Sequence, residues 1–254
     1  MGAHAFRATS ATSSPWDQRL QHGGPVSALL ASTIERTYPR PEMRVAQATI
    51  DFLGPMPRAE VSVRTQIVRP GRQIELGEAT MEHDGRVFAL ARLWRIRVLA
   101  REDAQPRDES PPDLSGAREL REFPGLEGWG YGEAIAWHFV SGGYACPGPA
   151  DVWTHVRLPL VAGEALLPLE RALIVADSAN GVSAERALEE WISVPPRLTV
   201  TFLRYPAGEW ILLQARSTLA GDGIGACVFT LADTSGAFAY GSQPLLVDRR
   251  RPAL

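Results

Sequence analysis

The sequence predicts an α+β fold in which a unit of one helix and one antiparallel sheet occurs twice. Three observations predict it. An apolar helix starts near Pro25, and a second covers about residues 168–179. Each helix is followed by short segments of alternating polarity with turn residues between them, which is typical of antiparallel strands. Each of these strand series opens with a Phe-Leu pair near a proline, Phe52-Leu53 and Phe202-Leu203.

The first unit is expected over residues 1–100. The polar start, residues 1–21, is expected to form an arm or a short strand. Pro25 suits the first helical turn, and apolar residues at helical spacing continue the helix until before Pro39. Four strands are expected after it, separated by turns such as Asp84-Gly85. They cover residues 45–52, 60–68, 72–82 and 86–98.

A linker is expected at residues 101–124, which hold many charges, several prolines and no apolar period. The second unit then covers residues 125–254. Its helix is expected to end in a left-handed cap at Asn180-Gly181. Its strands are expected at residues 134–140, 150–158, 198–203, 209–219, 224–232 and 237–247. Pairing between edge strands of the two sheets would leave fewer exposed edges.

Composition limits the function classes. The 254 residues are 45% hydrophobic and 22% charged, which is ordinary for a globular protein with a sizeable core. A net charge of -3 gives no general electrostatic reason to expect binding to nucleic acid or an anionic membrane. We find neither an apolar run that could span a bilayer nor a signal peptide, so a cytoplasmic protein is expected.

Metal and cofactor motifs are not found in the sequence. Cys146 and Cys227 are far apart among small or apolar residues, and we interpret them as core residues. The five histidines do not have the spacing of metal ligands. A nucleophile elbow, a complete dinucleotide fingerprint and a P-loop are also missing. We therefore expect no metal and no cofactor.

Two polar residues are candidates for catalysis. Asp177 falls in the last turn of an apolar helix, where the helix dipole disfavours a carboxylate. It is either a solvated helix end or a carboxylate that orients or deprotonates a water, and we favour the second interpretation. Gln243 can donate and accept at once, so it could hold a water or an acyl carbonyl. A polar residue on the solvent face of a strand is an equally good interpretation of Gln243.

Two further features allow a functional and a plain interpretation. Thr199 and Thr201 share one face of a strand, but threonine is also a good strand former. His22-Gly23-Gly24 precedes a helix N-terminus, where backbone amides could bind an anion or a polarised carbonyl oxygen. The plain interpretation of that motif is a tight turn into the helix.

In order and spacing, these motifs resemble the acyl-CoA thioesterase family with a double hotdog fold, in its thioesterase II-like branch. The resemblance covers nearly the whole chain. It rests on Pro15-Trp16, Gln21-His22-Gly23-Gly24-Pro25, Arg69-Pro70-Gly71-Arg72, Ala176-Asp177-Ser178-Ala179-Asn180-Gly181, Leu198-Thr199-Val200, Gly208-Glu209-Trp210 and Gly241-Ser242-Gln243.

The resemblance implies hydrolysis of acyl-CoA to free acid and CoA, in lipid metabolism, without a metal or a covalent acyl-enzyme. In the family an Asp, a Thr and a Gln hold the attacking water, and two of these roles carry over to Asp177 and Gln243. A helix N-terminal amide would polarise the thioester carbonyl. His22, Gly23 and Gly24 would then bind substrate, and an apolar tunnel would take the acyl chain. A homo-oligomer is compatible with this assignment.

The family's threonine does not carry over directly, because Pro196 occupies the expected place. Thr199 is the substitute on the same strand. We therefore expect one active site in the second half, with Asp177, Gln243 and Thr199 as catalytic residues. A non-catalytic acyl-CoA or acyl-carrier binding protein is the main alternative, favoured by Pro196. A hotdog enoyl-CoA hydratase is ranked lower, because the motif around Asp177 contains no histidine.

Overall fold

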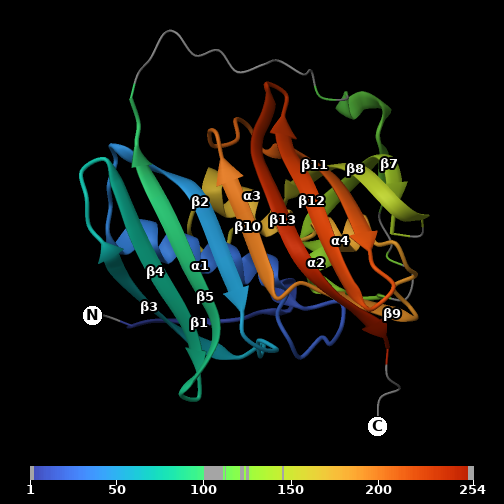
Figure 1. Cartoon of the computed structure of the whole chain (residues 1–254), viewed down its shortest axis with the longest axis horizontal. Coiled ribbons are helices and arrows are strands. Elements are labelled where there is room, and N and C mark those ends of the chain that lie inside the picture. The colour runs from blue at the N-terminus through green and yellow to red at the C-terminus, as the bar shows by residue number, and fades with distance from the viewer. Residues whose placement is uncertain are drawn as a thin grey trace.

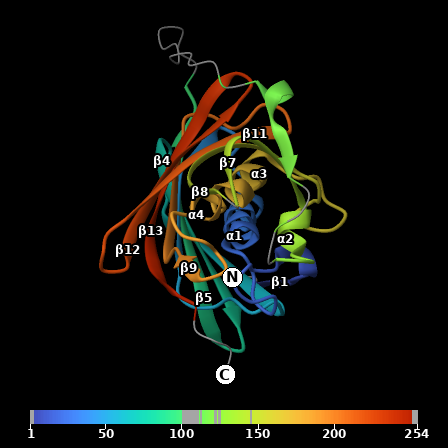
Figure 2. The same ribbon diagram turned by 90° about the vertical axis from the view of Figure 1, so that its right-hand side faces the viewer.

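A curved antiparallel sheet surrounds a small set of helices on its inner face (Figures 1 and 2). This architecture is seen in a computed structural model that describes residues 3–99, 111, 113–120, 123, 126–144 and 146–250. In Figure 2 the sheet is viewed along its side and curves around α1, α3 and α4. The predicted α+β class is therefore confirmed.

The first half contains the predicted helix and all four predicted strands. α1 packs against β3, β4 and β5, and β1 adds an edge strand along β3. Gly77 lets α1 approach the sheet closely, because a Cβ there would lie 2.7 Å from the Ile34 side chain. The elements are β1 (Ala3–Arg7), a 3-10 turn η1 (Ser10–Thr12), α1 (Gly23–Thr37), β2 (Met43–Phe52), β3 (Glu60–Arg69), β4 (Ile74–His83) and β5 (Arg86–Arg97).

The second half repeats the arrangement and adds elements that the sequence did not indicate. β6 lies inside the segment expected as a linker and pairs with β7, while most of residues 101–112 are outside the described residues. The elements are η2 (Leu114–Gly116), β6 (Arg118–Leu120), α2 (Gly130–Glu133), β7 (Ile135–Gly143), β8 (Cys146–Val156), α3 (Pro168–Ala176), α4 (Ala179–Val182), β9 (Trp191–Val194), β10 (Arg197–Phe202), β11 (Trp210–Leu219), β12 (Ile224–Asp233) and β13 (Gly236–Arg249).

The second helix differs from its prediction. It is two short helices, since α3 ends at Ala176 with Asp177 as its C-cap. Asn180 and Gly181 lie inside α4, so the predicted left-handed cap at these residues is wrong. The backbone of Asp177 stays right-handed, with φ -71° and ψ -11°, and the chain bends over Asp177 and Ser178 without unwinding. Asp177 therefore lies at the break between the two helices.

The two halves form one continuous sheet. Strands β2 and β10 pair antiparallel, with Ile50 opposite Leu198 and Ala48 opposite Val200. All four of these side chains are buried, so the junction belongs to the core and confirms the expected pairing of edge strands. The strand order is β1-β3-β4-β5-β2-β10-β13-β12-β11-β8-β7-β6, and β9 pairs with the end of β13.

Helices α1 and α3 pack side by side in opposite directions. At one end a Cβ on Gly24, at the start of α1, would lie 2.4 Å from the carbonyl oxygen of Ile174, near the end of α3. At the other end Arg36, near the end of α1, pairs with Glu170 in the first turn of α3 at 2.6 Å. The N-terminus of each helix therefore lies beside the C-terminus of the other.

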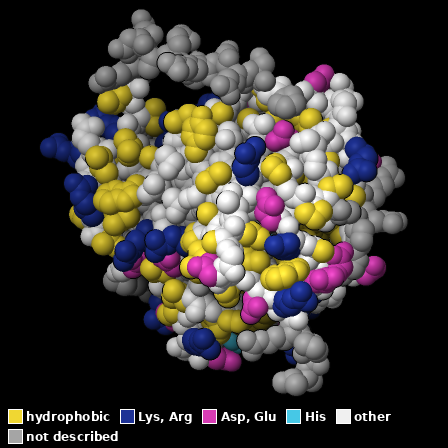
Figure 3. Space-filling model, turned by 45° about the vertical axis from the view of Figure 1, so that its right-hand side comes forward, with side chains coloured by type: hydrophobic (Ala, Val, Ile, Leu, Met, Phe, Trp, Pro, Cys, Tyr) yellow, Lys and Arg dark blue, Asp and Glu magenta, His cyan; other side chains and the backbone are white. Residues whose placement is uncertain are grey.

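The face of the second half in Figure 3 mixes apolar side chains with basic and acidic ones. The apolar residues exposed on β12 and β13 include Ile224, Val228, Tyr240 and Leu246. Cys227 is buried as expected, but Cys146 is exposed, so its assignment to the core is wrong. Among the described residues, we find no helix long and apolar enough to cross a membrane.

Candidate active site

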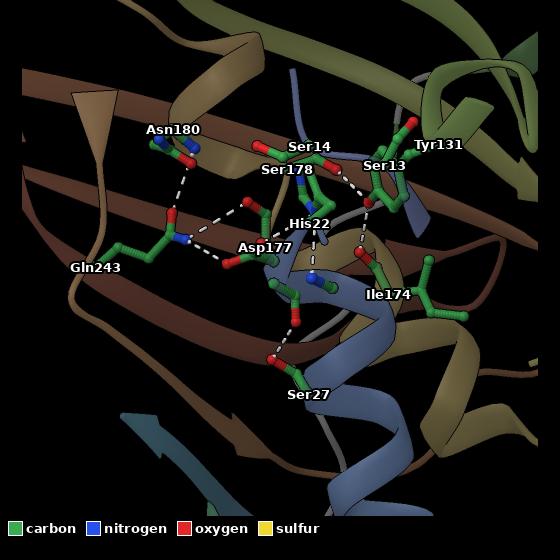
Figure 4. A network of polar contacts seen from close by, with 12 residues as sticks. Ser13, Ser14, His22, Ser27, Tyr131, Ile174, Asp177, Ser178, Asn180 and Gln243 are labelled. Atoms are coloured by element: carbon green, nitrogen blue, oxygen red, sulfur yellow. Dashed lines mark hydrogen bonds and ion pairs between the residues drawn. The ribbon is translucent and has the colours of Figure 1, made fainter. Parts of the chain in front are cut away.

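The Asp177 carboxylate is buried and has partners from both halves of the chain (Figure 4). Its Oδ1 accepts a hydrogen bond from Gln243 Nε2 at 3.1 Å, and its Oδ2 lies 3.1 Å from His22 Nδ1. Gln243 comes from β13 of the second half, and His22 precedes α1 of the first. Asp177 therefore lies between the two units, where Gln243 of the second half and His22 of the first half both contact it.

The position of Asp177 explains how a carboxylate is tolerated at the end of α3. The C-terminal end of α3 is the negative end of its helix dipole, and a negatively charged carboxylate there is unfavourable. However, α1 runs the opposite way and begins beside it. A Cβ on Gly23, the first residue of α1, would lie 2.6 Å from Asp177 Oδ2. Asp177 is thus also at the positive end of α1, whose first N–H groups have no partner within the helix.

Gln243, on β13, fixes the orientation of the Asp177 side chain. It is fully buried, so the interpretation as a solvent-face residue is wrong. Its Oε1 accepts from the backbone N–H of Asn180 at 3.3 Å, which directs Nε2 toward Asp177. The Asn180 side chain is held in turn by the carbonyl of Ser193 at 2.8 Å. A buried amide with both ends bonded has one orientation, and it holds the carboxylate in place.

His22 is the N-cap of α1 and is nearly enclosed. Its Nδ1 accepts from the backbone N–H of Gly24 at 3.1 Å, and its ring stacks on Tyr131 at 3.8 Å and 8°. The Tyr131 hydroxyl bonds both the Ile174 carbonyl and Ser178 Oγ at 2.7 Å. Burial raises the pKa of Tyr131 well above its ordinary value, so this hydroxyl stays neutral. Tyr131 therefore acts as a fixed support for the imidazole.

Thr199 is not part of this cluster. It pairs with Ser242 and Thr49, and its side chain is on the outer face of the sheet with theirs. Gln243 is the next residue after Ser242 on β13, so its side chain projects from the opposite, inner face. The prediction of Thr199 as a third catalytic residue is not supported by this placement. Thr201, on the same face, bonds Gln47 through Oγ1 at 3.2 Å.

A cavity of about 400 Å³ opens in front of the Asp177 carboxylate. His22, Gly23 and Ser178 line it beside Asp177, whereas Gln243 and Thr199 are not in its wall. Most of the remaining wall is apolar and comes from both halves. These apolar residues include Trp16, Leu20, Phe52, Met56, Leu188, Ile192, Val194, Pro195, Pro196 and Leu246.

The opposite end of the helix pair holds an ion pair. There the Glu170 carboxylate accepts from the backbone N–H of Leu167 at 2.8 Å and pairs with Arg36 at 2.6 Å. Arg36 also pairs with Glu164. A carboxylate and a guanidinium from the protein itself thus occupy the place that corresponds to the cavity before α1. The two copies of the fold differ in this respect.

Several residues of the site could not be identified from the sequence. Asn180 belongs to the same short motif as Asp177, and its place three residues after Asp177 could have identified it as a site residue. Tyr131 gave no signal, because α2 is a four-residue helix without a usable period. No group of three or more His, Cys, Asp or Glu side chains within the described residues is placed to hold a metal ion.

Comparison with known families gives two matches that together span most of the chain. Residues 12–96 match the N-terminal domain of acyl-CoA thioesterases, and residues 102–247 match the C-terminal domain. The chain therefore belongs to the acyl-CoA thioesterase family and is a thioester hydrolase. The predicted family and enzyme class are confirmed.

Solved structures with the same fold have little sequence in common with this chain. A Thermobifida fusca protein proposed to be a thioesterase II has a TM-score of 0.78 at 16% identity, over 97% of this chain and 92% of its own. An Alicyclobacillus acidocaldarius protein with a hot dog fold has a TM-score of 0.76 at 15% identity, over 99% of this chain and 94% of its own. The tesB protein of Mycobacterium avium subs paratuberculosis has a TM-score of 0.73 at 15% identity, over 97% of this chain and 92% of its own. A search of curated proteins found no match. The double hotdog fold is confirmed.

Proposed function

We propose that this protein hydrolyses acyl-CoA to a free acid and CoA, with a water activated by Asp177. One observation carries the proposal. A buried carboxylate, fixed by Gln243 and adjacent to His22, forms part of the wall of an apolar cavity at the start of a helix. A carboxylate in such a place can orient a water and accept its proton.

The thioester carbonyl is proposed to bind at the N-terminus of α1. Gly23 lines the cavity, and its N–H is one of the first-turn donors that have no partner within the helix. That donor and the helix dipole stabilise the negative charge that develops on the carbonyl oxygen during attack. Water adds to the carbonyl carbon, and its proton passes to the Asp177 carboxylate. The C–S bond then breaks, its electron pair goes to sulfur, and the proton held by Asp177 is returned to the sulfur, so that the free acid and the thiol are released.

The acyl chain is proposed to occupy the apolar part of the cavity. Burying one methylene group contributes about 0.8 kcal/mol, so a wall of this composition favours acyl groups of several carbons. Trp16, Phe52 and Met56 come from the first half, while Ile192 and Leu246 come from the second. Both halves therefore contribute to chain-length selection in this proposal.

The CoA portion of the bound substrate is proposed to extend out of the cavity past Trp16. A second cavity, of about 240 Å³, shares Ser14, Pro15 and Trp16 with the first and also contacts Arg250. The Arg250 guanidinium lies over the Trp16 ring, 5.2 Å from its centroid, and its buried Nε has no partner within the described structure. A guanidinium in this position can bind a phosphate group of CoA.

Thiol release from a panel of acyl-CoA chain lengths tests the function. Wild type should release CoA from at least one member, and Asp177→Asn should reduce kcat about 10²- to 10⁴-fold, the usual contribution of acid–base catalysis. Asparagine keeps the size of the side chain, so folding should be preserved. Equal release by both proteins would contradict the role of Asp177.

A non-hydrolysing acyl-CoA or acyl-carrier binding protein is the second candidate. It is favoured by Pro196, which lines the cavity and occupies the position where the resemblance leads us to expect a threonine. Tight binding of acyl-CoA by wild-type protein with no thiol release across the panel would select this candidate.

We also propose a cytoplasmic role in lipid metabolism and a homo-oligomer in solution. The apolar side chains exposed on β12 and β13 support the second of these, because pairing of two outer sheet faces would remove them from water. Light scattering of the purified protein tests it, and a monomer at micromolar concentration would contradict it.

A further inference from the structure

One hydroxyl group in the wall of the cavity in front of Asp177 has no partner within the described residues. The hydroxyl-bearing side chains of this wall are Ser14, Tyr144 and Ser178. Ser178 Oγ bonds the Tyr131 hydroxyl at 2.7 Å, and Ser14 Oγ accepts from a backbone N–H at 3.2 Å. Tyr144 Oη bonds none of the residues that the structure describes. Since buried tyrosine hydroxyls usually have a partner, this one indicates a partner from outside the chain.

Tyr144 reaches the cavity from the turn between β7 and β8. Gly142 and Gly143 precede it with φ values of 72° and 147°, which favour glycine. A Cβ on Gly142 would lie 2.5 Å from a backbone carbonyl oxygen of β8. On the other side of the turn, the backbone N–H of Gly148 bonds the carbonyl of Ala184, just after α4, at 2.9 Å. The glycines therefore bend the hairpin, and its turn is tied to the chain that follows α4.

Aromatic side chains hold the Tyr144 ring in place. Their edges or faces meet it at centroid distances of 5.2 to 6.1 Å, and they are Phe123, Trp129, Trp137 and Phe139. The ring also lies beside α4, with Cε1 3.8 Å from the place that a Cβ on Gly181 would take. The hydroxyl oxygen is not among the fully enclosed side-chain atoms without a partner. A ring fixed in this way presents its hydroxyl to the cavity that it lines.

The Tyr144 hydroxyl is a constant donor. Burial raises the pKa of Tyr144 above its ordinary value, and no neighbouring charge contributes to that rise. For Tyr131, in contrast, the Asp177 carboxylate is one of the causes of the raised pKa. Tyr144 therefore stays neutral, and its chemistry is that of binding and not of proton transfer.

We propose that Tyr144 donates a hydrogen bond to an oxygen on the acyl group, and so selects acyl-CoA substrates whose chain carries a hydroxyl or carbonyl oxygen. This inference rests on the proposed function. Trp129 lines both the cavity in front of Asp177 and the smaller cavity beside Arg250, whereas Tyr144 lines the first alone. The CoA portion is proposed to extend through the smaller cavity, so Tyr144 faces the acyl portion.

A plain alkyl chain is the poorer ligand for such a wall. When the chain displaces water from Tyr144, the hydroxyl loses a hydrogen bond and gains none, which carries a free-energy cost. An oxygen at the matching place on the chain restores the bond. A polar group built to bond the substrate discriminates against the analogue that lacks the matching group more strongly than an apolar wall can. Tyr144 is thus a specificity-determining residue in a wall that is mostly apolar.

Tyr144→Phe removes the oxygen and keeps the ring with its aromatic contacts. The test measures kcat/KM for acyl-CoAs of one chain length, unsubstituted or with a hydroxyl at successive carbons. For at least one isomer, the ratio of hydroxylated to unsubstituted kcat/KM should be about three- to tenfold lower in Tyr144→Phe than in wild type. Tyr38→Phe is the matched control and should keep the wild-type ratio, because its hydroxyl bonds the Thr65 carbonyl at 3.2 Å outside this wall.

Two outcomes of these kinetics would overturn the proposal. An unchanged ratio for every isomer would show that Tyr144 does not contact an acyl oxygen. An equal fall of kcat/KM on all substrates would move the contact to the CoA portion. Tyr144→Phe should also unfold at a temperature no lower than that of wild type, because the hydroxyl bonds nothing in the protein. A clearly lower unfolding temperature would reveal a partner within the chain and would contradict the inference.

A binding measurement separates this inference from the proposed function. Thioether analogues of CoA, with and without the hydroxyl, cannot be hydrolysed, and calorimetry gives their affinities for both proteins. The affinity ratio should fall in Tyr144→Phe by the same factor as the kinetic ratio, and an unchanged affinity ratio would overturn the inference. A wild type that releases no thiol from any acyl-CoA contradicts the proposed function alone, so the two failures are distinguishable.

Discussion

His22 Nδ1 lies 3.1 Å from Asp177 Oδ2, although the two residues belong to different helix-and-sheet units. The contact exists because α1 and α3 pack in opposite directions, so the start of one helix meets the end of the other. At that meeting point the protein places a carboxylate, an imidazole and the first N–H groups of α1. The site is therefore formed only when both halves have folded against each other.

Gln243→Met should impair both catalysis and stability. The near-isosteric side chain leaves the Asn180 N–H and the Asp177 carboxylate without their buried partner. A lost buried partner costs about 1–3 kcal/mol. Thiol release and urea unfolding measure the two effects. Thr199→Val is the matched control on the outer face, and its activity should stay within about twofold of wild type. A stronger effect of Thr199→Val than of Gln243→Met would reverse the assignment.

Gly23→Ala should disrupt the site without a change in charge. Its Cβ would lie 2.6 Å from both Asp177 Oδ2 and the tip of Phe52. Displacement of catalytic groups by about 1 Å can cost about 100-fold in rate, so we expect kcat to fall by about that factor. Gly181→Ala is the control, since it also borders the cavity but its nearest contact would be Tyr144 at 3.8 Å. Steady-state kinetics of the two variants should differ clearly, and equal kinetics would contradict the close packing at Gly23.

Arg250→Ala should weaken binding of the CoA portion of the substrate. We expect KM for an acyl-CoA to rise about tenfold, equivalent to about 1.4 kcal/mol. The N-acetylcysteamine thioester of the same acyl group lacks the phosphates of CoA. Wild type and Arg250→Ala should therefore hydrolyse this thioester with the same KM and kcat. Arg249→Ala is the control, because Arg249 stacks on Trp191 at 5.2 Å and is not in the cavity wall. An equal loss on both substrates would argue against a phosphate contact.

Stability should fall at high pH in part because of Tyr205. Burial raises the pKa of this phenol to about 12, and its oxygen accepts from the Val45 N–H at 3.0 Å. An unfolded tyrosine has a pKa of about 10, so the unfolded state ionises first. The stabilising contribution is complete below pH ~10 and is lost as pH rises toward ~12. Urea unfolding at several pH values should show a smaller loss across this window for Tyr205→Phe. An identical loss in both proteins would contradict this assignment.

Much of the fold could be predicted because strand patterns are local. The alternating burial of β3 and β4 follows from residues two positions apart, and the turn between β4 and β5 needs the positive φ of Asp84 and Gly85. The short elements β9 and α2 were missed because four residues are too few to show a period. The break after Ala176 was missed because Asp177 keeps right-handed dihedrals, so no glycine or proline marks it.

The candidate site shows where local reasoning is not sufficient. Asp177 was identified because a carboxylate at the end of an apolar helix is unusual. Thr199 was chosen by its strand, but the alternation of apolar Leu198 and Val200 already places those two residues inward and Thr199 outward. For His22 the sequence indicated a helix start and nothing about its partner, since contacts between distant segments leave no local pattern.

The sequence by itself determined the duplicated helix-and-sheet architecture, the two most informative site motifs and the family resemblance, because periodicity, turn chemistry and motif order are properties of neighbouring residues. Only the tertiary structure decided that the carboxylate of the second half faces the imidazole of the first, and that Arg36 pairs with Glu170 at the other end of the helix pair. The physical reason is the antiparallel packing of α1 and α3, which brings the N-terminus of each helix beside the C-terminus of the other.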